Sequence, residues 1–204
     1  MIDDSQPQAI GNAKPAGHLG LAPSPWILRF AHLVPAQARV LDLACGRGRH
    51  ARLFADRGCR VVAVDRDAET LATLVGEANI DPRRLDLETG SWPLEGERFD
   101  AIVVTNYLHR PLFAFLLAAL SEDGVLLYET FARGHEAYGR PTNPDFLLQP
   151  DELLDTTRDR IRVVAFEQGR AVAGGAAFVV QRLAAVGCAR AWPPALMPSD
   201  APRD

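Results

Sequence analysis

Lysine is nearly absent from this chain of 204 residues, because Lys14 is the only lysine among its 22 lysines and arginines. The sequence therefore leaves almost no room for a catalytic lysine inside a folded domain. Cysteine is also scarce, and Cys45, Cys59 and Cys188 form an odd set without CxxC spacing. This usage argues against a disulfide framework or a zinc ribbon and predicts a cytoplasmic location.

Long apolar segments are missing as well. The longest fully apolar run, Leu112–Leu120, is too short to span a bilayer, so we expect no membrane partner. The N-terminus is acidic and polar, unlike a secretory signal. The five histidines show no HxxxH or Cys/His ligand spacing, so no metal site is expected. A net charge of −4 gives no reason to expect broad nucleic-acid binding, but local arginine clusters leave an RNA partner open.

Proline divides the chain into three parts. Residues 1–25 are proline-rich and are predicted to form a flexible arm, residues 26–188 the main domain, and residues 189–204 a tail. In the main domain, short β-rich runs alternate with helical patterns. The expected strands are 39–44, 60–64, 83–87, 99–104, 124–130, 161–166 and 176–183, and the expected helices are 48–57, 68–77, 111–120 and one that begins at 150–152.

This alternation predicts an α/β fold with a mostly parallel sheet and helices on both faces. A short glycine-containing link between the last two strands indicates a hairpin, which makes the last strand antiparallel. Ligands of such sheets bind beyond the carboxyl ends of the strands, where the strand order reverses. We therefore expect the functional residues just after the strands.

A glycine-rich turn follows the first expected strand, within the run Val40–Ala51. Gly46 and Gly48 allow the backbone to approach a ligand where a Cβ would collide. Asp42, just before the turn, would repel the pyrophosphate of a dinucleotide but would attract the ammonium group of S-adenosylmethionine. The alternative is that Asp42 only caps the turn.

Polar side chains also follow the next strands. Asp65 ends the second strand, where it can accept hydrogen bonds from both ribose hydroxyls of a nucleoside, or be an ordinary solvated aspartate. Asp86 follows the third strand and can accept from an adenine amino group, or be a common loop residue. Asn106 and Tyr107, past the fourth strand, are placed to contact the amino-acid part of the ligand.

The order of these segments resembles the class I S-adenosylmethionine-dependent methyltransferases over most of residues 35–185. The resemblance implies a Rossmann-like sheet of seven strands with an antiparallel last strand, S-adenosylmethionine as the cofactor, and methyl transfer. The segments that carry it are Val40–Ala51, Asp65, Asp86, Phe99–Tyr107 and Gly124–Thr130. The cofactor contacts that it implies fall on Asp42, Ala44, Cys45, Gly46, Gly48, Asp65, Arg66, Asp86, Leu87, Asn106 and Tyr107.

Within this class, the chain resembles small bacterial members of the tellurite-resistance type. The stretches Tyr128–Phe131, Gly134–Glu136 and Pro141–Leu148 are also similar to a group of uncharacterised bacterial members. Those tend to have asparagine at the position of His135, which leaves the role of this histidine open.

Candidate catalytic residues follow the fourth and fifth strands. Tyr107 and His109 follow the fourth strand, and Glu129 ends the fifth. Tyr138 lies in the long segment 131–149, which is predicted to fold over the cleft as a lid. Because a sulfonium is already an excellent leaving group, positioning of the acceptor supplies much of the catalysis. For each of these residues, the alternative to a catalytic role is a structural one. Two arginines complete the set of candidates, Arg110 and Arg140.

The sequence thus predicts a methyltransferase that acts on a small molecule or oxyanion. The alternatives are an RNA or protein methyltransferase, and a non-catalytic module that binds S-adenosylmethionine. A nicotinamide-dependent oxidoreductase is disfavoured, because the folded domain has no lysine for a Tyr-x-x-x-Lys motif. The oligomeric state is left open.

Overall fold

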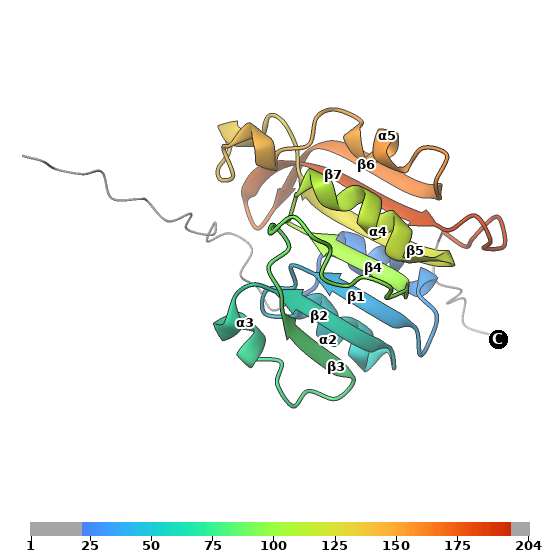
Figure 1. The fold of residues 1–204 in the computed structure, drawn as a ribbon. Coiled ribbons are helices and arrows are strands. Elements are labelled where there is room, and N and C mark those ends of the chain that lie inside the picture. The colour runs from blue at the N-terminus through green and yellow to red at the C-terminus, as the bar shows by residue number, and fades with distance from the viewer. Residues whose placement is uncertain (1–21, 197–204) are drawn as a thin grey trace, which may run out of the picture.

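A single mixed sheet forms the centre of the protein, for which the structure, a computed structural model, describes residues 22–196 (Figure 1). Its strand order is β3-β2-β1-β4-β5-β7-β6. The strands are β1 (Arg39–Leu43), β2 (Arg60–Asp65), β3 (Ile80–Arg84), β4 (Phe99–Thr105), β5 (Leu120–Phe131), β6 (Arg162–Ala173) and β7 (Ala176–Val186). The α-helices are α1 (Pro25–Phe30), α2 (Arg49–Asp56), α3 (Ala68–Ala72), α4 (Phe113–Ala119) and α5 (Glu152–Thr157), and short 3-10 helices are η1 (Ala31–Leu33), η2 (Arg110–Leu112), η3 (His135–Ala137) and η4 (Pro144–Phe146).

The directions of the strands confirm the predicted Rossmann-like sheet. The last strand, β7, is antiparallel to both β5 and β6, and the pairs among β1 to β5 are parallel. The carboxyl ends of β1, β2, β4 and β5 therefore meet at one edge. The strand order reverses between β1 and β4, which makes this edge the expected place for a ligand.

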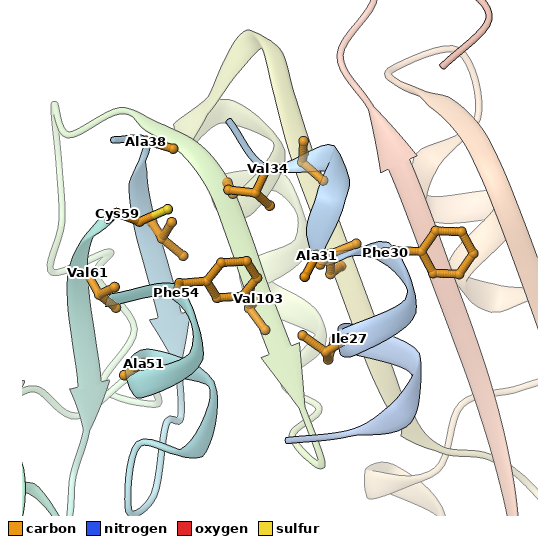
Figure 2. Close-up of a cluster of buried hydrophobic side chains, with 14 of the residues drawn as sticks. Ile27, Phe30, Ala31, Val34, Ala38, Ala51, Phe54, Cys59, Val61 and Val103 are labelled. Atoms are coloured by element: carbon orange, nitrogen blue, oxygen red, sulfur yellow. The ribbon is translucent and has the colours of Figure 1, made fainter. Parts of the chain in front are cut away.

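Helices cover both faces of the sheet, as the alternation predicted. Figure 1 shows α4 in front of the sheet and α2 behind it. Val103 of β4 packs with Phe30 of α1 and Phe54 of α2 on one face (Figure 2). The preceding residue, Ile102, faces the opposite side and packs in the cluster that contains Leu116 of α4. Burial on both faces explains why the central strands are almost continuously apolar.

The third strand lies earlier in the chain than expected. Residues 83–87 were predicted to form it, but β3 begins at Ile80, which pairs with Val61 of β2. Pro82 lies inside this strand, where its missing N–H is tolerated because β3 is at the edge of the sheet.

Two predicted helices are shorter than expected. The helix predicted over 68–77 ends at Ala72, and the one predicted over 111–120 becomes η2 followed by α4. Leu120, the last residue of the apolar run, begins β5 and pairs with Phe99 of β4. The apolar run therefore forms helical turns and then the first residue of a strand.

Both ends of the described segment contact the domain. Ser24 is 3% exposed, and its side chain caps α1 by accepting from the Trp26 N–H at 3.1 Å. Near the other end, Arg190 donates to the Leu33 carbonyl, and the Ala195 carbonyl lies 2.9 Å from Nε2 of His32. Most of the predicted arm and the last part of the predicted tail lie outside the described residues. Within 22–196, no helix has the length and apolar character needed to cross a membrane.

Gly187 closes the turn after β7, and we expect its replacement by alanine to destabilise the fold. A Cβ at this position would lie 2.1 Å from the backbone oxygen of Glu122, so backbone atoms have to move. We expect Gly187→Ala to lower the free energy of unfolding by about 1–3 kcal/mol in urea titrations. Gly139→Ala is the matched control, because nothing lies within 4 Å of the added Cβ there. Equal stability of the two variants would contradict this assignment.

Candidate functional site

The glycine-rich turn lies at the carboxyl edge of the sheet, directly after β1. Ala44, Gly46 and Gly48 all have positive φ angles, of 52°, 55° and 73°. A Cβ on Gly48 would lie 2.5 Å from the Leu74 side chain, so the helix α2 that begins after it needs glycine there. The Cys45 N–H donates to the Val64 carbonyl at 2.9 Å, which fastens the turn to β2.

Asp65 joins the end of β2 to the same turn. Its Oδ2 accepts from the Gly46 N–H at 2.7 Å, and its Oδ1 accepts from the Asp67 N–H at 3.0 Å. Asp65 is half-buried. Sequence reasoning placed Asp65 beside the glycine turn, and the structure brings the two together.

Asp42 lies beneath the turn and is 1% exposed. Its Oδ2 accepts from the Ala51 N–H at 2.9 Å, so the capping role that was the alternative reading is present. Burial raises the pKa of Asp42 from 3.8 to about 7, while the Ala51 N–H and the charge of Arg49 oppose this rise. Contact of Asp42 with a ligand stays a prediction.

This raised pKa predicts a specific pH dependence of stability. Because the folded state holds the proton of Asp42 up to about pH 7, its stabilising contribution is complete below pH 3.8 and is lost as the pH rises through 7. We expect wild-type protein to lose up to ~1.4 kcal/mol per pH unit relative to Asp42→Asn between pH 4 and 7. Urea unfolding of both proteins at pH 5 and pH 7 measures this difference, and identical pH dependence would contradict it.

The segment after β3 and the end of β4 also border the site. Asp86 is exposed, and its Oδ1 accepts from the Glu88 N–H at 2.9 Å, whereas Leu87 is buried in the core. Arg66 lies 4.0 Å from the Glu88 carboxylate. Burial, together with the charges of Glu88 and Asp86, raises the pKa of Tyr107 well above its usual value.

Asn106 has a φ of 54°, and its N–H donates to the Glu129 carbonyl at 2.9 Å. With its left-handed backbone conformation, Asn106 directly follows β4, and its hydrogen bond holds the end of β5 beside it. His109 is half-buried at the start of η2. The structure thus brings Asn106, Tyr107 and Glu129 to one edge.

Glu129 lies in a buried polar network and is 8% exposed. Its Oε1 accepts from the Ser24 hydroxyl at 3.0 Å, and its Oε2 forms an ion pair with Arg182 Nε at 2.7 Å. The Ser24 N–H donates to Nε2 of His50 at 3.1 Å, and burial and Arg49 lower the pKa of that histidine to about 3. Sequence reasoning missed Ser24 and Arg182, and no local motif marks either of them.

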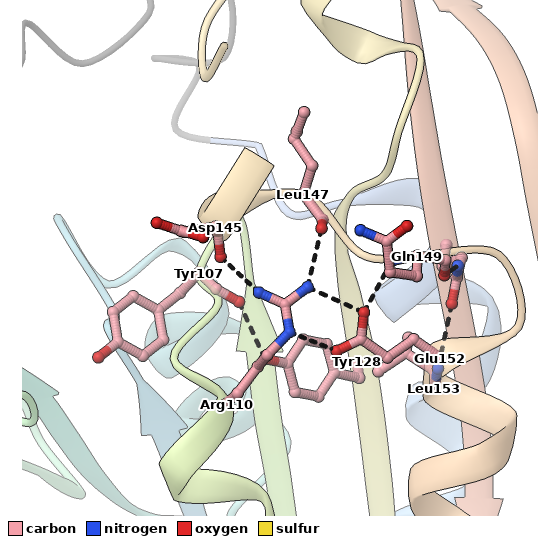
Figure 3. A network of polar contacts seen from close by, with 9 residues as sticks. Tyr107, Arg110, Tyr128, Asp145, Leu147, Gln149, Glu152 and Leu153 are labelled. Carbon is pink, nitrogen blue, oxygen red and sulfur yellow. Dashed lines mark hydrogen bonds and ion pairs between the residues drawn. The ribbon is translucent and has the colours of Figure 1, made fainter. Parts of the chain in front are cut away.

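Arg110 fixes the segment 143–149 to the domain (Figure 3). Its guanidinium donates to both carboxylate oxygens of Glu152, at 2.6 and 2.9 Å. It also donates to the carbonyls of Asp145 and Leu147, at 2.7 and 2.9 Å. Arg110 therefore has the structural role that was its alternative, and contact with an acceptor stays a prediction.

His135 has a structural role as well. It is 5% exposed, stacks on Phe131 at 4.1 Å, and contacts the Arg140 carbonyl through Nε2 at 2.9 Å. Its Nδ1 accepts from the Val179 N–H at 3.4 Å. Tyr138 is 46% exposed in the same segment. Of this part of the predicted lid, the structure shows His135 anchored and Tyr138 at the surface.

A surface cavity of about 430 Å³ lies at the opposite, amino edge of the sheet, beside Arg39, Arg60 and Arg83. None of the predicted site residues lines it, and Glu97 already pairs with two of these arginines. The candidate site is therefore the carboxyl edge, where the glycine turn and Asp65 meet. No three His, Cys, Asp or Glu side chains within residues 22–196 are placed to hold a metal ion.

Residues 40–122, which contain the glycine turn, Asp65 and Asn106, match the family model described as "Methyltransferase domain". This central segment of the chain is therefore similar to a methyltransferase domain. Two methyltransferases of similar fold were solved with S-adenosylhomocysteine, the product that S-adenosylmethionine leaves after methyl transfer. The matched part of the domain ends within β5, so the 131–149 segment and the closing hairpin lie beyond it.

Three known proteins are similar to parts of this chain. The protein YqeM of Bacillus subtilis (strain 168), to which a methyltransferase function has been ascribed, is 27% identical over 115 residues, which is 51% of this chain and 47% of YqeM. The crystal structure of TehB from Haemophilus influenzae is similar with a TM-score of 0.67 and 18% identity, over 79% of this chain and 61% of TehB. A Burkholderia thailandensis 1,6-didemethyltoxoflavin N1-methyltransferase is similar with a TM-score of 0.58 and 23% identity, over 78% and 75% of the two chains.

The likeness to the solved structures concerns the fold. The chain spans about half the length of YqeM and about three fifths of TehB. The match to the family model therefore covers the glycine turn and its neighbouring strands, whereas the acceptor of this protein has to be argued from its own residues.

Proposed function

We propose that this protein binds S-adenosylmethionine at the carboxyl edge of the sheet and transfers its methyl group to a small molecule or oxyanion. The observation that carries the proposal is the 2.7 Å hydrogen bond from the Gly46 N–H to Asp65. It fastens the open glycine turn after β1 to the acidic residue that ends β2, inside a domain that matches the methyltransferase family model.

The residues of the edge fit such a cofactor. Gly46 and Gly48 provide the positive φ angles that shape the turn, and the half-buried Asp65 carboxylate can accept hydrogen bonds from ribose hydroxyls. We assign the adenine end to the segment that contains Asp86 and Leu87. The amino-acid end is assigned to the turn and to Asn106. The proposed cofactor contacts are Asp42, Ala44, Cys45, Gly46, Gly48, Asp65, Arg66, Asp86, Leu87, Asn106 and Tyr107.

The acceptor side of the proposal rests on the ends of β4 and β5. When bound, S-adenosylmethionine supplies a methyl group on a sulfonium, which is an activated leaving group. Tyr107 and Glu129 are the groups that we propose to orient the acceptor, because both lie at the edge and Asn106 ties their strands together. His109 and Tyr138 are retained as candidates on position alone.

A small acceptor is supported by what similar folds bind. The Burkholderia enzyme was solved with 1,6-didemethyltoxoflavin, and a coclaurine N-methyltransferase of similar fold was solved with N-methylheliamine. The segment 131–149 also supports a small acceptor, because Arg110 and the Val179 N–H of β7, which donates to His135, hold it against the domain.

Transfer of a labelled methyl group tests this proposal. The protein is incubated with methyl-labelled S-adenosylmethionine and separate pools of small amines, phenols, carboxylates and oxyanions, RNA, and protein. We expect label in a low-mass product. Label that enters only RNA or protein would contradict the small acceptor. Cofactor binding without transfer to any pool would favour a non-catalytic module.

A further inference from the structure

Arginines from three neighbouring strands gather at the amino edge of the sheet, around the cavity of about 430 Å³. Arg39 begins β1 and Arg60 begins β2, and the two residues are direct partners in the register of these strands. On β2, Arg60 lies on the same face as Val62, because successive side chains of a strand point to opposite faces. Val62 pairs with Asp81 of β3, so Arg83, two residues further along, lies on that face as well.

The connection from β3 to β4 does not add a helix to this face. Residues 85–98 contain none, whereas helices normally cover both faces of parallel strands. Helices α2 and α3 pack on the other face, in the cluster that contains Phe54 and Leu71. The cavity is lined by residues of β1, β2 and β3 and by Asn79, which precedes β3. The amino ends of these strands therefore keep an open hollow.

Two of the three arginines are held in place by acidic residues. Glu97 pairs with both Arg39 and Arg83. Asp81 also pairs with Arg83, at 2.8 Å. The Arg39 guanidinium in addition lies over the Phe99 ring, with Cζ 4.6 Å from the ring centroid. These contacts fix one wall of the cavity and balance the charges of Arg39 and Arg83.

Arg60 is the arginine whose charge is left without a counter-ion. It is exposed, and among residues 22–196 its guanidinium has no hydrogen-bond or ion-pair partner. The side-chain amide of Asn79 is also exposed and has no partner in the same range. Arg60 nevertheless lies beside Arg39 in the register, where two like charges repel each other. The cavity thus combines one uncompensated positive charge with the free N–H donors of two side chains.

A phosphate group has the chemistry that these donors fit. Its oxygens accept charge-assisted hydrogen bonds, and it has enough of them to accept from a guanidinium and an amide at once. The volume of the cavity falls in the range of small-molecule sites. We propose that this cavity binds the phosphate group of a small molecule, with Arg60 and Asn79 as its donors. Val62 and Ile80, which also line the cavity, provide apolar contact for the rest of the molecule.

This site is separate from the proposed cofactor site. Arg60 and Asp65 lie at opposite ends of β2, and the five residue steps between them span about 17 Å in a strand. The inference goes beyond the proposed function and does not depend on it, because none of its residues belongs to the carboxyl edge.

Titrations followed by NMR test the phosphate site. The side-chain amide signals of Asn79 are the reporter. They are identified by their loss in Asn79→Gly, since glycine tolerates the positive φ of 62° at this position. Wild-type protein is titrated at constant ionic strength with inorganic phosphate, glucose 6-phosphate, acetate and a single-stranded RNA oligonucleotide, each in a separate experiment. We expect saturable shifts with both small phosphates and at least about tenfold weaker binding of acetate.

Variants show whether Arg60 carries the binding. Arg60→Gln removes the free guanidinium and should weaken both small phosphates about tenfold or more. Arg60→Lys keeps the charge without the planar fork, so its loss should be intermediate. Arg170→Gln is the matched control, because Arg170 is an exposed arginine of β6, on the other side of the sheet from β3, and it should bind as wild type does. Urea unfolding verifies that the variants are equally folded.

Four results would overturn the inference. A shift of the Asn79 signals that does not saturate, or equal effects of Arg60→Gln and Arg170→Gln, indicates an adventitious ion only. Equal affinity for acetate and phosphate contradicts a phosphate site. Binding of the RNA oligonucleotide without binding of the small phosphates assigns the cavity to nucleic acid instead. If the inference holds, the tighter of the two small phosphates identifies the source of the group as a free phosphate or a phosphate ester.

Discussion

Asp65→Ala is expected to weaken the binding of S-adenosylmethionine and S-adenosylhomocysteine at least about tenfold. Charge-assisted hydrogen bonds to the ribose contribute about 1.5–3 kcal/mol each, and the variant removes their acceptor. It also removes the acceptor of the Gly46 N–H at 2.7 Å, so the glycine turn loses its attachment to the end of β2. Isothermal titration calorimetry measures both affinities.

Two further variants show whether this loss belongs to the site. Asp65→Asn keeps one oxygen that can accept from the Gly46 N–H, so we expect a smaller loss. Asp123→Ala removes an equal charge from an exposed position at the opposite edge, at the start of β5, and should bind as wild type. Wild-type affinity in Asp65→Ala would contradict the ribose assignment.

Arg110→Met is expected to lower the free energy of unfolding by about 2–3 kcal/mol, since it removes four charge-assisted hydrogen bonds that are only partly exposed. The Glu152 carboxylate then keeps only its bond from the Gln149 N–H. We also expect faster hydrogen exchange at the amides of the segment 143–149. Urea unfolding and exchange mass spectrometry give the two measurements.

Arg158→Met provides the comparison for this prediction. Arg158 pairs with Asp155 on the surface, and both side chains are more than half exposed, so its removal should lower the free energy of unfolding much less. If Arg110→Met proves as stable as Arg158→Met, the segment is not held by Arg110.

Local signals in the sequence predicted the part of the fold that forms the cofactor edge. Glycines that need positive φ, an aspartate cap at Asp67 and a left-handed glycine after α2 at Gly58 are short-range features, and the structure contains all of them. The hairpin of β6 and β7, with its antiparallel last strand, also followed from a short glycine-containing link.

Features that depend on distant partners could not be predicted in this way. The apolar run Leu112–Leu120 is compatible with a helix throughout, and only pairing with Phe99 moves Leu120 into β5. Ser24 carries no motif, and its role appears only when the fold brings it to Glu129, 105 positions away in the chain. The partners of Arg110 could not be predicted either, because Asp145 and Glu152 lie far along the sequence.

Calorimetric titration with S-adenosylmethionine and S-adenosylhomocysteine, with NADH as the control, tests the central claim most directly. The account predicts micromolar binding of both adenosyl ligands and no binding of NADH, with the affinity lost in Asp65→Ala. Absence of binding for both adenosyl ligands would contradict the account, because the glycine turn would then hold no cofactor.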